Sequence, residues 1–195
     1  MPKTPIDPSS EVQASKVVIV DSSILQHVLD LLCTLLKKSQ SSKEQFKVII
    51  QVFPQILEYV NNSDDMFMLL HGTAALKSFI CIGHAEILQI VTSKRIIEVA
   101  KKLLSPTLAE QAALMLGGLI IYIFHRIEPK IDTNLLMSVV WKIYKSRMPS
   151  IVQTLVLIFA RLILSNPNEI VTFLTDTSID NRISLKIVLD KWLLQ

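Results

Sequence analysis

The stretch that decides the fold class is residues 43–62, which read KEQFKVIIQVFPQILEYVNN. Its large apolar residues recur at steps of three and four and therefore share one stripe of a helix, whereas the charged and amide side chains fall outside that stripe. The apolar stripe holds Phe46, Ile49, Ile50, Phe53, Leu57 and Val60, and the polar positions are Lys43, Lys47, Gln51, Gln55 and Glu58. Because Pro54 lacks an amide donor, we expect this amphipathic helix to bend or restart there.

The same helical period continues on both sides of this stretch. Capping residues and prolines mark the expected ends: Ser105 followed by Pro106 predicts the cleanest helix start in the chain, and Pro167 predicts a break. The expected helices are 21–38, 43–60, 63–90 with a weak point at Gly83, 93–104, 105–126, 132–147, 149–165, 167–175 and 180–192. No strand is expected.

Grouped in chain order, these helices form about four and a half antiparallel pairs. Each pair takes roughly 40 to 45 residues, which is the period of HEAT and armadillo repeats. We therefore predict an all-α protein, an α-α superhelix or HEAT/armadillo-like solenoid over residues 21–195, with a flexible segment at 1–20. A globular helix bundle is the competing arrangement. Gly117 and Gly118 in mid-helix indicate that another helix crosses closely there.

The composition excludes several classes of protein. Half of the 195 residues are hydrophobic and 19% are charged, so the chain can bury a sizeable core and is not disordered. Its 4 glycines and 8 prolines are too few for the many turns of a β-sandwich or barrel. A net charge of +3 is too small for the dense basic surface that duplex nucleic acid demands, so we expect no direct nucleic-acid contact.

Membrane insertion has to be weighed because the mean hydropathy is +0.45. The longest uncharged apolar run, residues 112–124, is 13 residues long, whereas a membrane span needs about 20. We therefore expect no membrane span and interpret the apolar helices as buried within a stack. Cys33 and Cys81 match neither a disulfide framework nor a zinc-ligand spacing, and no secretory core is found, so an intracellular, reducing compartment is favoured.

The sequence offers no constellation for catalysis. The glycines form no phosphate-binding loop, and both cysteines lie in apolar runs, which raise the pKa of a thiol. Asp64 and Asp65 are adjacent acids that helix capping explains better than acid–base chemistry does. The histidines lie too far apart along the chain for metal-ligand spacing on one helix face; they are His27, His71, His84 and His125. We expect no enzyme activity, no cofactor and no metal.

Positive charge gathers on the second helix of successive pairs. In helical-pair solenoids these second helices line the concave wall, where partners bind, so the charge indicates a candidate patch for an acidic partner. An ordinary solvated face is the alternative interpretation. The candidate partner-binding residues are Lys94, Arg95, Lys101, Lys102, Lys142, Lys145 and Arg147.

Six parts of the sequence share their order and spacing with a known family. They are 51–54 (QVFP), 62–65 (NSDD), 71–79 (HGTAALKSF), 150–155 (SIVQTL), 159–162 (FARL) and the closing residues Leu185, Val188, Lys191, Trp192 and Gln195. Together they resemble the C-terminal half of the importin-β superfamily (karyopherins), most closely the importin-nine type of nuclear transport receptor. In that type a similar Phe-Pro helix is followed by an Asp-Asp turn and a helix opening with glycine.

The resemblance implies a HEAT-repeat carrier that binds protein cargo, in this family basic cargo such as histones. It also implies passage through nuclear pores by contact with nucleoporins, control by the GTPase Ran, and localisation in both cytoplasm and nucleus.

Two features depart from the family pattern. Ran binding in such receptors depends on N-terminal repeats, which this chain lacks, and no acidic insertion is present to hold histones. We therefore expect a fragment of a longer import receptor or a truncated relative of one. The alternative hypothesis is a generic HEAT-repeat scaffold subunit of a protein complex, without transport activity.

Overall fold

Helices make up most of the described chain, which comprises residues 22–127 and 132–193 of a computed structural model. The segment 1–20, which we expect to be flexible, lies outside the described residues. The helical elements are α1 (Ser22–Lys38), the 3-10 turn η1 (Ser39–Ser41), α2 (Lys43–Ile50), α3 (Phe53–Asn62), α4 (Met66–Ile90), α5 (Ser93–Leu103), η2 (Glu110–Ala113), α6 (Leu116–Tyr122), η3 (Ile123–Ile127), α7 (Thr133–Lys145), α8 (Pro149–Ser165), α9 (Pro167–Asp176) and α10 (Ser184–Leu193).

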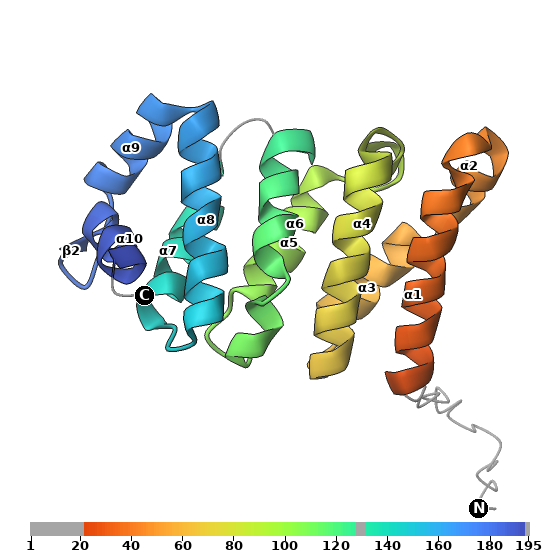
Figure 1. The fold of residues 1–195 in the computed structure, drawn as a ribbon, viewed down its shortest axis with the longest axis horizontal. Coiled ribbons are helices and arrows are strands. Elements are labelled where there is room, and N and C mark those ends of the chain that lie inside the picture. Colours follow the sequence, from red (N-terminus) through yellow and green to blue (C-terminus); the bar gives the residue numbers. More distant parts are fainter. Residues whose placement is uncertain (1–21, 128–131, 194–195) are drawn as a thin grey trace, which may run out of the picture.

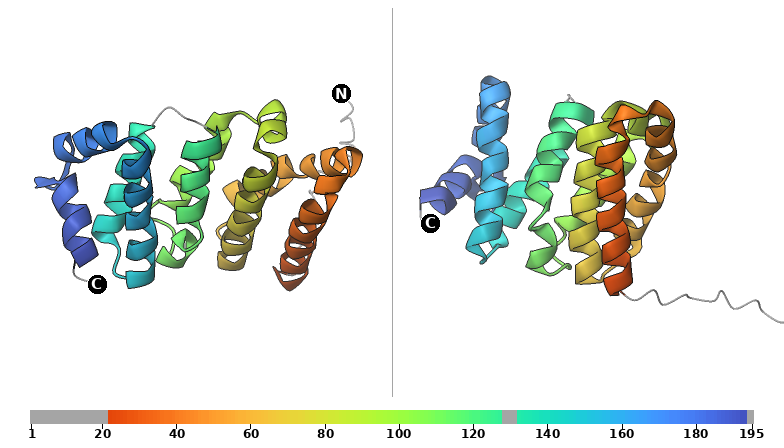
Figure 2. Two further views of the ribbon diagram at one scale, coloured as in Figure 1. Left: turned by 45° about the horizontal axis from the view of Figure 1, so that its top comes forward. Right: turned by 45° about the vertical axis from the view of Figure 1, so that its right-hand side comes forward.

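The helices form two layers that run along the long axis of the molecule (Figures 1 and 2). In the first layer α1 packs on α4, α4 on α6, and α6 on α8; in the second, α3 packs on α5, α5 on α7, and α7 on α10. The two layers also meet where α3 packs against α4, α5 against α6, and α7 against α8. Each of these contacts joins the second helix of one predicted pair to the first helix of the next. The arrangement is a row of stacked pairs, as predicted, and not a closed bundle.

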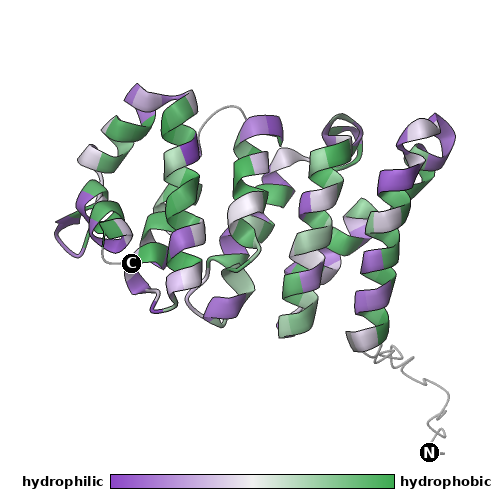
Figure 3. Cartoon of the chain, viewed as in Figure 1, coloured by the Kyte–Doolittle hydropathy of each residue, from purple (hydrophilic) through white to green (hydrophobic). Residues whose placement is uncertain are grey.

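The core is continuous through both layers. Hydrophobic residues run along the helices, and hydrophilic residues gather at many of the turns (Figure 3). Phe53 and Phe79, both fully buried, join α3 to α4 with ring centroids 6.0 Å apart. Because each helix has only one stripe against its own partner, the remaining apolar surface is buried only where the next pair packs.

The prediction of a break near Pro54 is confirmed. The helix ends at Ile50 and restarts at Phe53, with Pro54 in the first turn, where a missing amide costs no hydrogen bond. Asp65, rather than Ser63 or Asp64, is the N-cap of α4: its Oδ1 accepts a hydrogen bond of 2.8 Å from the Met68 amide. Gly83 leaves the helical region (φ −127°, ψ 33°) and kinks α4 at the expected weak point.

The prediction of a regular helix over 105–126 is wrong. Residues 104–109 form turns, a 3-10 turn follows at η2, and the helix proper begins only at Leu116. The Ser105 hydroxyl oxygen accepts a local hydrogen bond from the Thr107 amide (3.3 Å). The Ser105 carbonyl oxygen accepts a second hydrogen bond from the Lys142 ammonium of α7 (3.1 Å). The local cap hydrogen bond of Ser105 therefore forms, but it opens a turn and not a regular helix.

The expectation of no strands is also wrong. A short antiparallel hairpin, β1 (Ser178–Ile179) with β2 (Arg182–Ile183), precedes α10. Its two-residue turn places Asp180 and Asn181 at φ 49° and 63°, a left-handed conformation that Asp and Asn tolerate better than most residues. As a result α10 begins at Ser184, not near Asp180.

Within the described ranges, α4 is the one helix long and apolar enough, by length and composition alone, to cross a membrane. Counting uncharged runs missed it because Lys77 interrupts it. Half of its most apolar window is buried inside the protein, where α4 packs against α1, α3 and α6. A core helix meets the same criterion, so these properties do not distinguish a membrane span from a core position.

The two adjacent glycines of α6 lie in different surroundings. A Cβ added to Gly117 would come within 2.8 Å of the Thr154 carbonyl oxygen of α8, so the two backbones touch there. A Cβ on Gly118 would meet the flexible side chain of Lys77, whose Cδ would lie 2.9 Å away. The predicted close helix crossing is therefore confirmed at Gly117.

Replacing these glycines with alanine should have opposite effects. Gly117→Ala forces α6 away from α8 and should lower the free energy of unfolding by about 1–3 kcal/mol. Gly118→Ala, the matched control, should be neutral or stabilising by up to about 1 kcal/mol, because alanine is the better helix former. Urea unfolding of both variants checks this; equal stability of the two would contradict the close crossing.

Candidate protein-binding face on the second helix layer

The structure brings the predicted basic residues onto one layer. Lys94, Arg95, Lys101 and Lys102 lie on α5, Lys142 and Lys145 lie on α7, and Arg147 lies in the turn before α8. Helices α5 and α7 pack side by side in the second layer. Six of the seven candidate residues thus lie on two neighbouring helices, but their side chains make different kinds of contact.

Lys102 reaches back to the end of the preceding second-layer helix. Its Nζ donates to the carbonyl oxygens of Asn61 and Ser63, the latter at 2.7 Å, at and just beyond the C-terminus of α3. The Asp64 carboxylate lies 3.7 Å from the same ammonium. The final carbonyls of a helix have no partner within the helix and carry partial negative charge, so a lysine is well suited to satisfy them.

Lys142 makes the same contact one pair further along. Its side chain is buried, with the residue 3% exposed, and its Nζ donates to the Ser105 carbonyl oxygen just beyond the C-terminus of α5 (3.1 Å). Burial lowers the pKa of Lys142, and the negative charge of Glu110 offsets part of that effect. Lys142 is therefore enclosed in the protein and does not belong to a partner-binding surface.

A third lysine, which the sequence analysis did not select as a site residue, completes the series. Lys191 of α10 donates to the Ser146 carbonyl oxygen, just beyond the end of α7, at 2.8 Å. We call Lys102, Lys142 and Lys191 the returning lysines. Each joins a second-layer helix to the C-terminal end of the preceding one, and their spacing along the chain follows the helix pairs.

Two other lysines reach forward to the next element. Lys101 lies 3.0 Å from Oδ2 of Asp132, whose Oδ1 accepts from the Leu135 amide and caps α7. Desolvation raises the pKa of Asp132, but these hydrogen bonds and the Lys101 charge outweigh it, so the pKa falls below its ordinary value. Lys145 lies 3.4 Å from Asp180 in the hairpin turn.

The outermost cations are the best placed for a partner. The Lys94 side chain is 84% exposed and pairs with Glu98 across one helical turn at 4.0 Å, a weak interaction. Arg95 and Arg147 are exposed, and the Lys145 side chain is 48% exposed. The predicted basic patch thus divides into these surface cations and the lysines that join the helices.

A groove between α5 and α7 adjoins these cations. Its volume is about 400 Å³, and Leu104 is buried beneath it while Met137 and Trp141 are half-buried in its wall. The full lining is Lys101, Leu104, Ser105, Pro106, Met137, Ser138 and Trp141. The ammonium of Lys145 lies 5.7 Å from the Trp141 ring centroid, within cation–π range. An apolar trough with cations at its border is therefore present.

Glu110 forms a junction that sequence reasoning did not identify. Its carboxylate accepts hydrogen bonds from the Ser146 hydroxyl (2.8 Å) and from the amides of Arg147 (3.2 Å) and Met148 (3.1 Å), at the N-terminus of α8. Desolvation raises the pKa of Glu110, but these bonds outweigh it and hold the pKa below its ordinary value. Glu110 lies within the expected helix 105–126, and no local signal in the sequence shows a tertiary role.

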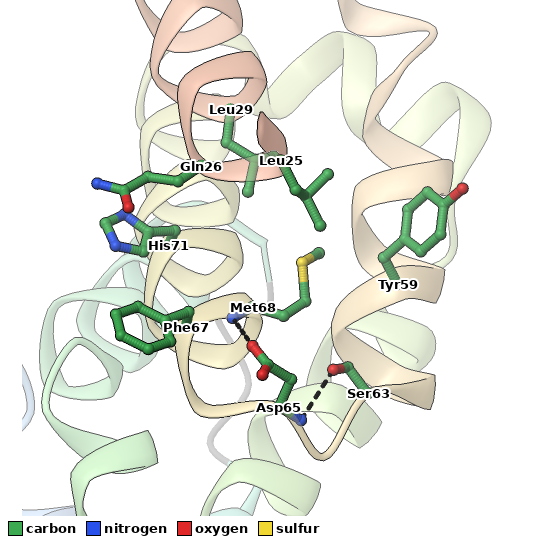
Figure 4. A pocket seen from close by; sticks show the side chains of 9 residues that line it. All are labelled: Leu25, Gln26, Leu29, Tyr59, Ser63, Asp65, Phe67, Met68 and His71. Carbon is green, nitrogen blue, oxygen red and sulfur yellow. Dashed lines mark hydrogen bonds between the residues drawn. The ribbon is translucent and has the colours of Figure 1, made fainter. Parts of the chain in front are cut away.

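A second hollow, of about 260 Å³, lies between α1, α3 and α4 and contains the Asp65 and His71 side chains (Figure 4). Two of its polar side chains bind the backbone: Asp65 caps α4, and the Ser63 hydroxyl accepts a hydrogen bond from the Asp65 amide at 3.0 Å. Leu25, Leu29 and Met68 supply much of the remaining lining. The hollow shows no arrangement of nucleophile and base.

The other reactive residues also remain apart. In the described ranges no three His, Cys, Asp or Glu side chains lie close enough together to hold a metal. Burial raises the pKa of the Cys33 thiol, which disfavours the reactive thiolate. Cys81 is exposed, contrary to the apolar environment expected for it.

Comparison with known proteins agrees with the stacked helix pairs. A family model described as "Importin-11-like, TPR repeats" matches residues 20–195. The chain belongs to the importin-β family. This family comprises nuclear transport receptors, which are not enzymes, and its helix-pair repeats account for the fold.

Two importins illustrate the relationship. Importin-9 of Drosophila melanogaster is 28% identical over 174 residues, which cover 85% of this chain and 17% of that protein. Importin subunit beta-5 of Saccharomyces cerevisiae is 32% identical over 101 residues, which cover 50% of this chain and 10% of that protein. The chain thus spans less than a fifth of the length of either importin.

Removing a returning lysine should destabilise the fold of this chain. Lys142→Ala leaves the Ser105 carbonyl oxygen without its ammonium partner and removes a buried aliphatic stem, so the free energy of unfolding should fall by about 1–3 kcal/mol. Lys94→Ala, on the same layer but exposed, should change it by less than about 0.5 kcal/mol. Urea denaturation distinguishes the two, and a Lys142→Ala variant as stable as Lys94→Ala would refute the structural role.

The stability contributed by Glu110 should depend on pH. Because its folded pKa lies below the ordinary value of 4.5, that contribution is present above pH 4.5 and is lost as the pH falls through the folded pKa. Glu110→Gln should therefore cost about 1 kcal/mol at pH 7 and progressively less below pH 4.5. Unfolding curves at several pH values test this, with exposed Glu58→Gln as the control; a pH-independent difference would contradict it.

Proposed function

We propose that this chain is a segment of a nuclear import receptor of the importin-nine type. In this proposal it contributes to carrying basic protein cargo such as histones, under control of the GTPase Ran and with nucleoporin contact, between cytoplasm and nucleus. The observation that carries the proposal is the match of one importin family model to residues 20–195, which covers every described helix pair. The similarity to Drosophila importin-9 over 85% of the chain supports the finer assignment.

The charge of the second layer bears on where cargo would bind. Lys94, Arg95, Lys145 and Arg147 are exposed on or beside α5 and α7, and like charges placed opposite each other disfavour association. Basic cargo such as a histone would therefore use a different surface of the receptor. The α5–α7 face is instead suited to an acidic partner.

A pull-down with the purified chain tests the transport proposal. The immobilised chain is incubated with histone dimers, and separately with GTP-loaded and GDP-loaded Ran; lysozyme serves as an unrelated basic control. Retention of histone dimers over lysozyme, or of Ran in its GTP form over its GDP form, is the expected result. Retention of neither would contradict a transport role for this segment and favour the scaffold alternative.

A further inference from the structure

We propose that the groove between α5 and α7 binds an acidic peptide segment through one large apolar side chain, which sits against Trp141. This inference rests on the proposed function, because it assigns a class of protein partner to the same second-layer face. It depends on three observations: the shape of the groove, the position of its cations, and the roles already taken by the other charges.

The groove has the size and lining of a side-chain pocket. Its volume of about 400 Å³ falls within the range of about 300–1,000 Å³ found for ligand pockets. Pro106 is exposed at the groove, Met137 and Trp141 form its wall, and Leu104 is buried beneath it. Half-buried aromatic and methionine side chains are the residue types enriched where proteins anchor a partner's side chain.

Cations border this groove and continue beyond it. Lys101 lines one edge, and Lys145 lies over the rings of Trp141 and Tyr144, with its ammonium 4.7 Å from the Tyr144 centroid. Arg182 of the hairpin also lies over the Tyr144 ring, with its guanidinium carbon 5.9 Å from the ring centroid. An extended peptide anchored at Trp141 would pass Lys145 and approach Arg182.

The two carboxylates near the groove do not block binding of an acidic peptide, because one is held within the protein and the other forms only a weak ion pair. Asp132 caps α7 and also holds Lys101, so it does not project a free charge into the groove. The ion pair of Lys145 with Asp180 spans 3.4 Å between side chains that are 48% and 62% exposed, so water screens it and a partner carboxylate can compete. Among the described residues, no ion pair involves Arg147 or Arg182.

The small number of cations around the groove favours a peptide over nucleic acid as the partner. A single strand of nucleic acid carries one phosphate per nucleotide and is bound by a continuous positive groove together with several stacking rings. Here the cations border one apolar trough beside Trp141 and Tyr144. A few carboxylates around one aromatic or aliphatic anchor match this layout.

Fluorescence anisotropy with the full chain tests the proposal. The probe is a fluorescein-labelled nonapeptide with a central phenylalanine flanked by four glutamates on each side. Two comparison peptides replace either the phenylalanine with serine or the glutamates with glutamines. We expect the probe to bind about tenfold more tightly than either comparison peptide, because apolar anchor and charge both contribute.

Variants locate the binding site. Ser138→Glu places a negative charge in the groove wall and should weaken binding of the probe about tenfold. Gln153→Glu, at an exposed position of α8 in the first layer, adds the same charge elsewhere and should leave binding within about twofold. Arg182→Gln, on the hairpin outside the core, should weaken binding about threefold and provides a second readout if Ser138→Glu is unfolded by its thermal melt.

The outcomes separate this inference from the transport proposal. Equal binding of the glutamine peptide, or unchanged binding by folded Ser138→Glu and Arg182→Gln, would overturn the groove assignment. Tighter binding of a twelve-nucleotide oligouridine that competes with the probe would assign the site to nucleic acid instead. A chain that retains histone dimers or GTP-loaded Ran but not the probe contradicts only the groove assignment, whereas a chain that retains none of the three contradicts both proposals.

Discussion

The constraint on which this structure depends is that no helix pair can bury all of its apolar surface alone. Helix α4 packs against α1, α3 and α6, which all belong to the neighbouring predicted pairs, and its fully buried residues include Leu69, Phe79 and Ile80. At the edge of the described row, α1 has a stripe of exposed apolar residues on the flank that no other described helix covers. They are Ile24, Val28, Leu31 and Leu35. Stacking therefore accounts for both the hydropathy of the chain and its elongated shape.

Polar side chains form hydrogen bonds between neighbouring helix pairs, in addition to the apolar contacts. The returning lysines satisfy the C-terminal ends of α3, α5 and α7, and the carboxylate of Glu110 satisfies amides at the start of α8. These contacts set the register between neighbouring pairs, which apolar packing alone leaves less defined. They also occupy part of the positive charge, so that the surface available to a partner is smaller than the sequence indicates.

Sequence reasoning predicted what depends on local pattern. The apolar period predicted most of the helices and their stacking in a row, Pro54 predicted a restart, and Gly117 predicted a close crossing, because each of these follows from residues near one another in the chain. It failed at 105–126, where Ser105 and Glu110 make hydrogen bonds to residues more than thirty positions away. The same reason explains why the predicted basic patch includes lysines that the structure places inside the protein. Whether a lysine contacts solvent or a distant carbonyl depends on tertiary packing, which the local sequence does not show.

Native-state amide hydrogen exchange measures the pair-on-pair burial most directly, because it reports the free energy of opening each helix separately. We expect the greatest protection in α4 and α6, which have neighbours on both flanks, and lower protection in α1 and α10. Protection in α1 equal to that in α4 would contradict the claim that neighbouring pairs supply the burial which holds each helix in place.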